Sequence, residues 1–311
     1  MTTRIAIIGL GSIAQKAYLP ILATWKGIEL LLCSRTASVV EGLQAQYRVR
    51  RGTTRLEEAL AWQPQAAFVL TSTAAHADIA SQLLAAGADV YLEKPAALTS
   101  QQAHQLSQQA EAGKRILMVG FNRRYAPLHC LGRELWGERQ VDIAVFQKHR
   151  SGGFHPDLSV HYTEEMIHII DMLRFFCGEG QPVQTAYEQN DRFSWGASAV
   201  ALQGGGHASL LASMGAGHWS ETYALHGEDA SLYVDAFTRV VWINRGEQRV
   251  WEETYASSWK TTLEGRGFQG EIAHFLECVE SRANPQTDGW EALKTQRLTE
   301  ALIALGKPIR E

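Results

Sequence analysis

Short apolar runs alternate with helical patterns along the first 120 residues of the chain. Each run is bounded by glycine or hydroxyl residues and has the length and β-branched content of a buried strand. The predicted strands are residues 4–8, 28–33, a short one near Tyr47, 66–70, 89–92 and 116–119. Strands that alternate with helices in this way are typical of a doubly wound parallel sheet, so we expect an N-terminal Rossmann domain over residues 1–122.

Beyond residue 122 the pattern changes to strands joined by short glycine or polar turns. Such hairpin-linked strands predict a large, mainly antiparallel sheet. The predicted strands are residues 141–148, 183–190, 197–203, 207–213, 222–227, 231–234, 240–244 and 248–252. Helices are predicted at 162–176 and 268–280. The expected fold class is α/β, with a C-terminal α+β domain over residues 123–311 whose last helices pack back on the first domain.

Composition narrows the class of partner. The 311 residues are 45% hydrophobic and 20% charged with a net charge of -4, which is ordinary for a globular chain and offers no basic surface for nucleic acid or anionic lipid. No apolar run is long enough to cross a membrane, and no cleavable leader precedes the first strand. The four cysteines form no CxxC pair, which argues against a zinc or disulfide framework. We therefore expect a cytoplasmic protein that acts on a small molecule.

A glycine turn follows the first strand. Gly9-Leu10-Gly11-Ser12-Ile13-Ala14 fits the dinucleotide fingerprint G-x-G-x-x-G/A. In that motif the first glycine makes the turn, the second lets backbone approach a pyrophosphate, and the third position stays small for packing. The phosphates then lie at the helix N-terminus, where free amides favour an anion. Gly9, Gly11, Ser12 and Ile13 are thus candidate cofactor residues.

The end of the second strand bears on the choice of cofactor. An acidic residue about twenty positions beyond the glycine motif usually binds the ribose of NAD, whereas an arginine accommodates the 2′-phosphate of NADP. Here Ser34 and Arg35 occupy that place. NADP(H) is therefore favoured and NAD(H) remains possible. The alternative is that Arg35 is a surface residue that caps the strand.

Two further strand ends carry polar groups. Thr71, Ser72 and Thr73 follow the fourth strand, where hydroxyls fit ribose and phosphate contacts but are equally expected as turn and cap residues. Glu93 and Lys94, with Pro95 after them, end the fifth strand at the edge where open α/β sheets bind ligands. The alternative for this second group is a solvated ion pair before a loop proline.

The helix predicted at 162–176 carries a polar stripe. Glu164, His168 and Asp171 are spaced i, i+4 and i+7, so they share one face of a regular helix. Histidine suits proton transfer near neutral pH, and a carboxylate one turn earlier can orient the ring. The same pattern also fits a solvent-facing stripe on an amphipathic helix. No further ligands have metal-site spacing, so no metal is expected.

These motifs together resemble the Gfo/Idh/MocA family of oxidoreductases over essentially the whole chain. The matching segments are Gly9–Ala14, Thr71–His76 (T-P-N-x-x-H), Glu93–Pro95 (E-K-P), Gly120–Tyr125 (G-F-x-R-R-F/Y) and Glu164–His168 (D-x-x-x-H). The segments at 15–17, 148–150 and 262–268 look most like the MviM-type branch. Glu164 replaces the usual Asp, which puts its role in doubt, and Ser72 replaces the usual Pro.

The resemblance implies roles for individual residues. Lys94 and His168 would be the proton-transfer pair, with Glu164 beside them as a catalytic carboxylate. Glu93 would hold the nicotinamide ribose, and His76 and Asn122 would also serve cofactor binding. The implied substrate contacts are Arg123, Glu165 and His149.

The implied activity is hydride transfer between NADP(H), or NAD(H), and a secondary alcohol or ketone of a sugar, sugar derivative or cyclitol. One alternative is a lyase or hydrolase that recycles tightly bound NAD(H). Another is a non-catalytic, NADP-sensing regulator. Family members often pair through the second sheet, so we expect a homodimer or homotetramer. Trp242 and Trp251 are candidate interface residues, and the alternative is that these large aromatic residues belong to the ordinary core.

Overall fold

The computed structural model describes residues 2–152, 155–189, 193–253 and 259–309. They form two compact units. The first combines Met1–Phe121 with Phe268–Lys294, and the second combines Asn122–Gly267 with Thr295–Glu311. The division expected from the sequence, 1–122 and 123–311, differs in that it placed all of 268–294 in the second domain.

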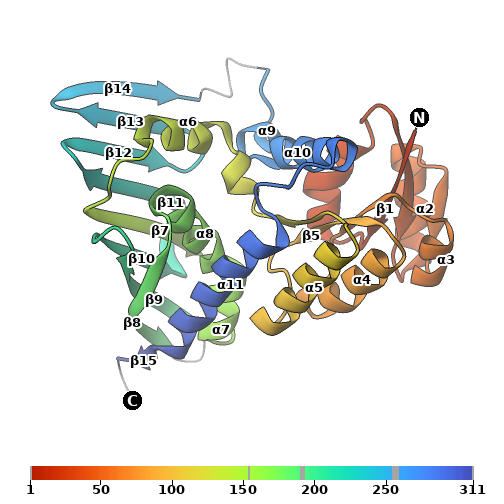
Figure 1. The fold of residues 1–311 in the computed structure, drawn as a ribbon, viewed down its shortest axis with the longest axis horizontal. Coiled ribbons are helices and arrows are strands. Elements are labelled where there is room, and N and C mark those ends of the chain that lie inside the picture. The colour runs from red at the N-terminus through yellow and green to blue at the C-terminus, as the bar shows by residue number, and fades with distance from the viewer. Residues whose placement is uncertain (1, 153–154, 190–192, 254–258, 310–311) are drawn as a thin grey trace. The chain divides into compact units, whose positions relative to one another are not determined.

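The first unit is built on a six-stranded parallel sheet (Figure 1). Its strand order is β3-β2-β1-β4-β5-β6, the order of a Rossmann fold. The strands are β1 (Thr3–Ile8), β2 (Ile28–Cys33), β3 (Arg51–Thr53), β4 (Ala66–Val69), β5 (Asp89–Glu93) and β6 (Leu117–Gly120). Every residue of β4, β5 and β6 is buried, as expected of a parallel sheet that helices cover on both faces. The edge strand β6 is also covered by Thr287, which bonds Val119. The predicted parallel sheet is confirmed.

Helices connect these strands in sequence order. A π-helical turn (Ala14–Tyr18) and α1 (Leu19–Leu22) follow the glycine turn. The others are α2 (Ala37–Tyr47), α3 (Leu56–Ala61), α4 (Thr73–Ala85), α5 (Ser100–Ala112) and α10 (Phe268–Ser281). The short strand predicted near Tyr47 is present but begins at Arg51, because Val40, Leu43 and Tyr47 are spaced as one helical face and extend α2 to Tyr47.

The second unit contains a nine-stranded sheet in the order β14-β13-β12-β11-β7-β10-β9-β8-β15. The pairs β10–β7 and β15–β8 are parallel and the others are antiparallel, so the expected mainly antiparallel sheet is confirmed. The strands are β7 (Ile143–Ser151), β8 (Gly180–Gln189), β9 (Phe193–Leu202), β10 (His207–Ser213), β11 (Gly215–Gly227), β12 (Ala230–Asp235), β13 (Arg239–Asn244), β14 (Glu247–Glu252) and β15 (Gly306–Pro308). Asn190, the predicted end of one strand, lies outside the described residues.

Helices also accompany this second sheet. They are a 3₁₀ turn (Asn122–Tyr125), α6 (Pro127–Trp136), α7 (Leu158–His161), a π-helical turn (Tyr162–Met166), α8 (Ile167–Cys177), α9 (Thr262–Gly265) and α11 (Gly289–Ala304). Helix α6 contacts strands β12 and β13, and helix α8 contacts strands β7 and β10. Both helices cover the same face of the sheet. Their apolar residues and the inward residues of the strands form the main core.

Trp242 belongs to that core. It is 7% exposed and packs edge to face on Trp136, with ring centroids 5.9 Å apart. The expectation that Trp242 faces a partner subunit is therefore wrong, because the two-residue period of β13 puts it inward beside Val240. Trp251 is also packed, partly buried, against this core.

Candidate active site

A groove of about 540 Å³ lies in the first unit beside the glycine turn. Its walls are the turn after β1, the end of β2 and the loop after β4, the edge at which open α/β sheets bind ligands. Six predicted cofactor residues line it: Gly9, Gly11, Ser34, Arg35, Thr71 and Ser72. The structure thus brings together in one groove three segments that the sequence analysis selected separately.

The two glycines of the turn have different constraints. Gly9 has a φ of +94°, and a Cβ there would lie 2.7 Å from backbone atoms of Leu70. A Cβ on Gly11 would meet no protein atom within 4 Å, so this face of the turn is open. Ser12 and Ile13, both exposed, begin the following helical run. An open face beside amides at the start of a helix fits the pyrophosphate of a dinucleotide.

His76 is buried between two loops. It is 1% exposed, and its ring nitrogens lie 2.8 Å from the carbonyl oxygen of Pro95 and 3.1 Å from that of Thr71. The ring therefore ties the turn that follows β5 to the loop that follows β4. That His76 serves cofactor binding stays a prediction. Because the ring contacts the two loops, its effect on the cofactor would come from holding those loops in place.

Glu93 is 9% exposed and ends β5. Its Oε1 accepts a hydrogen bond of 2.6 Å from the Tyr18 hydroxyl, and its Oε2 accepts one of 3.0 Å from the backbone amide of Lys94. Lys94 itself is half-buried. The carboxylate that the resemblance assigns to the ribose is therefore oriented by fixed donors before any ligand binds.

Behind Glu93 lie polar side chains that were not predicted from the sequence. Tyr18 and Tyr91 place their hydroxyls 2.8 Å apart, and Tyr18 also lies 3.3 Å from Oε1 of the fully buried Glu271 on α10. Burial, with Glu271 and Glu93 nearby, raises the pKa of both tyrosines, so both keep their protons. A Cβ on Gly120 would lie 2.5 Å from the Tyr91 hydroxyl, so only glycine leaves room there.

In the second unit a buried arginine links a carboxylate to a histidine. Arg123 donates from Nε and Nη2 to Glu221, at 2.5 and 2.7 Å. Its Nη1 lies 2.7 Å from Nδ1 of His168. Arg123 is 7% exposed and Glu221 is fully buried. These contacts are with protein groups, and the substrate contact expected of Arg123 stays a prediction.

Lys148 and Glu165 lie next to this link. Lys148 is the strand partner of Glu221 across β7 and β11, and its Nζ lies 2.7 Å from Oε2 of Glu165. Burial and Arg123 lower the pKa of Lys148 to about 8, although Glu221 and Glu165 oppose this. We call Arg123, Lys148, Glu165, His168 and Glu221 the charged cluster. Glu165, predicted as a substrate residue, is thus 9% exposed and paired.

The predicted stripe on the histidine-bearing helix is not one continuous face. A π-helical turn at Tyr162–Met166 separates Glu164 from His168, which changes the angular spacing between them. Asp171 is 1% exposed and holds Arg124 through two hydrogen bonds of 2.7 and 2.8 Å. The expectation that Asp171 belongs to a shared polar stripe is therefore wrong, since it forms a buried ion pair.

Of two other predicted residues, Asn122 contacts the charged cluster and His149 does not. The Asn122 side chain donates to the carbonyl of Arg266 at 2.8 Å and accepts from Arg123 at 3.4 Å. His149 follows Lys148 in β7, so its side chain points to the opposite face of the sheet. There it lies 3.2 Å from the Gln147 side chain, and burial lowers its pKa.

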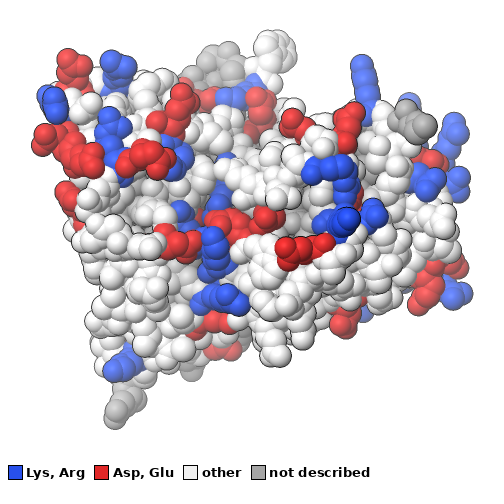
Figure 2. Space-filling model, viewed as in Figure 1, with Lys and Arg blue, Asp and Glu red and all other residues white. Residues whose placement is uncertain are grey.

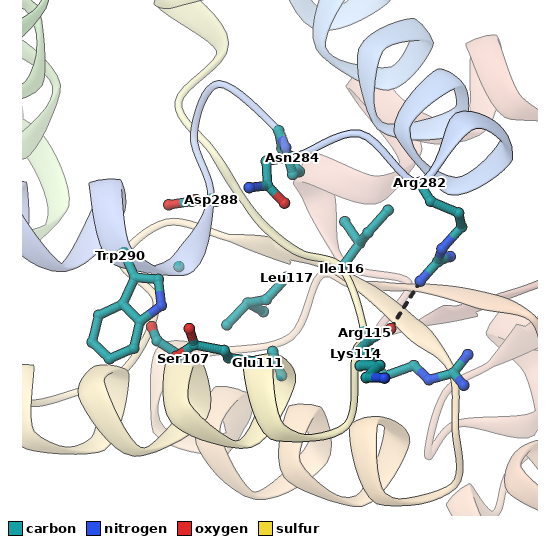
Figure 3. Close-up of a pocket in the computed structure, with 13 residues that line it drawn as sticks. Ser107, Glu111, Lys114, Arg115, Ile116, Leu117, Arg282, Asn284, Asp288 and Trp290 are labelled. Atoms are coloured by element: carbon teal, nitrogen blue, oxygen red, sulfur yellow. Dashed lines mark hydrogen bonds between the residues drawn. The ribbon is translucent and has the colours of Figure 1, made fainter.

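A second cavity of the first unit contains none of the predicted residues (Figure 3). Its volume is about 490 Å³, and α5, the start of β6 and residues 282–290 line it. The Arg282 guanidinium donates to Asp89 at 2.5 and 3.0 Å and to the Lys114 carbonyl. Because none of the predicted residues lines this cavity, the glycine-turn groove remains the candidate site.

Charge and hydropathy limit other classes of site. Figure 2 shows acidic and basic side chains interspersed over the visible face. Across the described ranges, no cluster of His, Cys, Asp and Glu is arranged to hold a metal ion. In the same part of the chain, no helix combines the length and hydrophobicity needed to cross a bilayer. The fold and the groove define a Rossmann-type protein with a site that fits a dinucleotide.

Comparisons with known proteins agree with this class. Residues 3–121 match the model of the Gfo/Idh/MocA family, described as an oxidoreductase family with an NAD-binding Rossmann fold. The putative oxidoreductase YceM of Salmonella typhimurium is 32% identical over 314 residues, covering 97% of each chain. The chain therefore belongs to the Gfo/Idh/MocA oxidoreductase family, and it is an NAD(P)-dependent dehydrogenase by class.

More distant relatives share the fold or part of the sequence. The MviM dehydrogenase of Clostridium difficile has a TM-score of 0.89 at 24% identity, covering 98% of this chain and 99% of that one. An inositol 2-dehydrogenase of Salmonella paratyphi B is 24% identical over 195 residues, 60% of this chain and 58% of the relative. Solved chains with the same fold, at 16% and 18% identity, hold NAD+ in one case and NADP in another.

Proposed function

We propose that this protein transfers a hydride between a nicotinamide dinucleotide and a carbinol or ketone carbon of a polyhydroxylated small molecule. The observation that carries the proposal is the groove beside Gly11, whose open face lies at the same sheet edge where β5 ends in Glu93 and Lys94. A bound cofactor there would accept or donate the hydride. Glu93 supplies a carboxylate of fixed orientation for a ribose hydroxyl.

The substrate class rests on relatives. Inositol 2-dehydrogenases are among the sequence relatives, and a 3-ketoreductase from Actinomadura kijaniata shares the fold. Both names describe oxidation or reduction at a carbon that bears oxygen. Sugars, sugar derivatives and cyclitols are therefore the substrates to test first.

Lys94 and His168 are the groups proposed to handle the hydroxyl proton and the charge that develops on the oxygen. Positioned acid-base groups contribute about 10²–10⁴-fold to such reactions. Glu164 is proposed as the catalytic carboxylate beside them, and Glu165 as a substrate contact, although Glu165 is already paired with Lys148. A substrate hydroxyl that displaces Lys148 would have to compete with a 2.7 Å ion pair.

The proposal is tested by replacing each proton-handling group. Lys94→Met and His168→Ala should each lower turnover by about 10² or more, the scale of lost acid-base help. Lys114→Met, on the loop after α5, is the matched control and should keep the wild-type rate. A substrate is first sought by thermal shift with sugars, sugar acids and cyclitols, since a ligand raises apparent stability by mass action. Near-normal turnover in both variants would overturn the assignment.

NADP(H) is proposed as the preferred cofactor. Ser34 and the exposed Arg35 line the groove with Thr36, so the end of β2 brings no carboxylate to repel a 2′-phosphate. NADPH should therefore raise the melting temperature more than NADH, and Arg35→Ala should reduce the difference. A shift with NADH and none with NADPH would refute this preference.

The open face of the nine-stranded sheet is proposed as the contact between subunits of a homodimer or homotetramer. Ile143, Tyr233 and Val250 on that face are 49%, 41% and 41% exposed. Multi-angle light scattering on the purified chain measures the assembly, and a monomer at micromolar concentration would refute it.

A further inference from the structure

The hydrogen bond between Arg123 and His168 restricts where the histidine carries its proton. A guanidinium is a donor at every nitrogen and does not lose its proton in proteins. The His168 Nδ1 that lies 2.7 Å from Arg123 Nη1 must therefore be the acceptor. In the neutral ring the single proton is then on Nε2, because a proton on Nδ1 would point at an N–H of Arg123.

Arg123 is held in this orientation from several sides. Glu221 binds it through both carboxylate oxygens, and the Tyr223 hydroxyl donates to the same carboxylate. Burial alone would raise the pKa of Glu221, but the charge and hydrogen bonds of Arg123 lower it to about 2, so the pair stays ionised. The carbonyl of Arg123 lies 3.0 Å from Nδ1 of the buried His129.

The neighbouring carboxylate does not offset Arg123 at His168. Asp171 lies three residues further along α8, and Arg124 occupies it through both oxygens at 2.7 and 2.8 Å. The two consecutive arginines of the 3₁₀ turn thus divide two side chains of α8 between them. Arg124 takes the acid, and Arg123 takes the imidazole.

We propose that Arg123, backed by Glu221, is a positioning residue that confines the proton of neutral His168 to Nε2, so that His168 donates a hydrogen bond to the reacting oxygen and keeps its proton. This inference rests on the proposed function and divides the labour of its two proton-handling groups. In the oxidation direction the substrate O–H bond breaks, and its proton passes to Lys94, which enters the step as the neutral amine and leaves it as the ammonium. The hydride leaves the same carbon for the cofactor. In reduction the Lys94 ammonium returns the proton.

A neutral imidazole that acts as a donor stabilises an alkoxide without a change of its own charge. Preorganised donors of this kind act where charge develops in the transition state. If His168 were instead the base, it would need a free lone pair on the nitrogen that meets substrate. The contact with Arg123 leaves the lone pair on Nδ1.

The tautomer can be measured without substrate or cofactor. Long-range ¹H–¹⁵N correlation spectra of the full chain, labelled with ¹⁵N-histidine, distinguish a protonated ring nitrogen from a bare one. The His168 signals are assigned by their loss in His168→Gln. We expect a ring with a bare Nδ1 and a protonated Nε2 near neutral pH. A protonated Nδ1, whether in the other neutral tautomer or in the imidazolium, would overturn the inference.

Arg124→Lys is the matched control for Arg123→Lys. Both changes replace a buried, bidentate arginine on the same turn, so both are expected to lower stability. Only Arg123→Lys should alter the ratio of the His168 tautomers, and equal spectra in the two variants would contradict the inference. If Arg123→Lys does not fold, the wild-type spectrum still decides.

The inference about the His168 tautomer and the proposed function can fail independently of each other. Failure of the wild-type protein to bind any nicotinamide dinucleotide in a fluorescence titration would overturn the proposed function and leave the tautomer unchanged. Binding of cofactor with a protonated His168 Nδ1 would overturn only the division of labour.

Discussion

The cofactor groove of the first unit and the charged cluster of the second are built by different means. The groove is shaped by backbone: a glycine turn, strand ends and loops that neighbouring parallel strands bring to one edge. The charged cluster is made of side chains, and its central pair, Arg123 and Glu221, is separated by 98 positions in the sequence. Backbone sites therefore leave short sequence motifs, whereas side-chain networks leave only scattered charged residues.

The strongest test of this difference removes the central carboxylate of the cluster. Glu221→Gln leaves the buried charge of Arg123 without its partner, which costs about 3–5 kcal/mol of unfolding free energy. Glu252→Gln is the control, because its ion pair with Arg239 is 47–61% exposed and such pairs contribute about 0–1 kcal/mol. Urea unfolding measures both. Equal losses would mean that the cluster is not what stabilises its unit.

The groove is tested by adding one methyl group at each glycine of the turn. Gly9→Ala should lower stability by about 2–4 kcal/mol, because it combines a positive φ with a close contact to the backbone of Leu70. Gly11→Ala meets no protein atom and should change stability by less than about 0.5 kcal/mol.

The same two variants separate folding from binding. Because the open face of Gly11 is where a pyrophosphate would approach, Gly11→Ala should weaken NADPH binding in a fluorescence titration while its unfolding curve stays unchanged. Unchanged affinity would show that the groove is not shaped by its backbone alone.

Acid should affect the side-chain network of the second unit. Burial lowers the pKa of His129 from 6.5 to about 4, although Glu221 opposes the shift. The unfolded chain then takes up this proton first, so stability present above pH 6.5 decreases as the pH falls towards 4. At pH 5 the loss attributable to one such histidine is about 2 kcal/mol.

Replacement of this histidine isolates its share. His129→Gln should flatten the fall in urea-unfolding free energy between pH 7 and pH 5 by about 2 kcal/mol. For each protein, the unfolding free energy at pH 7 is the reference for its value at pH 5. His161, whose pKa burial and His155 lower to about 3, should continue to contribute in the variant. An unchanged slope would contradict the assignment.

The smallest expected effect concerns a side chain that supports the cofactor groove from behind. Tyr18→Phe removes the 2.6 Å donor to Glu93 and keeps the aromatic ring, so NADPH affinity should fall about tenfold, the scale of one hydrogen bond to a charged group. Tyr91→Phe leaves that donor in place and is the matched control. If the two variants bind equally, side chains behind the groove do not orient Glu93.

The parallel sheet of the first unit followed from local patterns, and so did the position of the glycine turn. Gly9 is constrained by its own φ and by the neighbouring strand end, and such a constraint is visible as a motif within a few residues. Glu93 and Lys94 were likewise found from their place after a buried strand. Tyr18, Tyr91 and Glu271 were missed because the sequence around a buried aromatic or acidic residue does not indicate which distant residue it will hydrogen-bond.

The second unit was harder to predict in detail for physical reasons. Glu221 lies at the inward phase of β11 with Tyr223 and Leu225, which is a usable signal for a buried, paired carboxylate. The predicted strand began only at Thr222, so this signal was lost. The π-helical turn before His168 inserts a change of phase that a regular helical spacing cannot represent, and this misplaced Glu164 relative to His168.

The path of the chain has a consequence for synthesis on the ribosome. The first unit needs residues 268–294: Ile272 and Phe275 of α10 are fully buried in it, and Thr287 bonds the backbone of β6 through both its hydroxyl and its carbonyl. Residues 1–121 therefore leave the ribosome long before residues 268–294, which complete their core. Until then Tyr18, Phe68 and Tyr91 lack the ring of Phe275 that covers two of them. During translation the first unit to emerge is thus completed only after most of the second has been made.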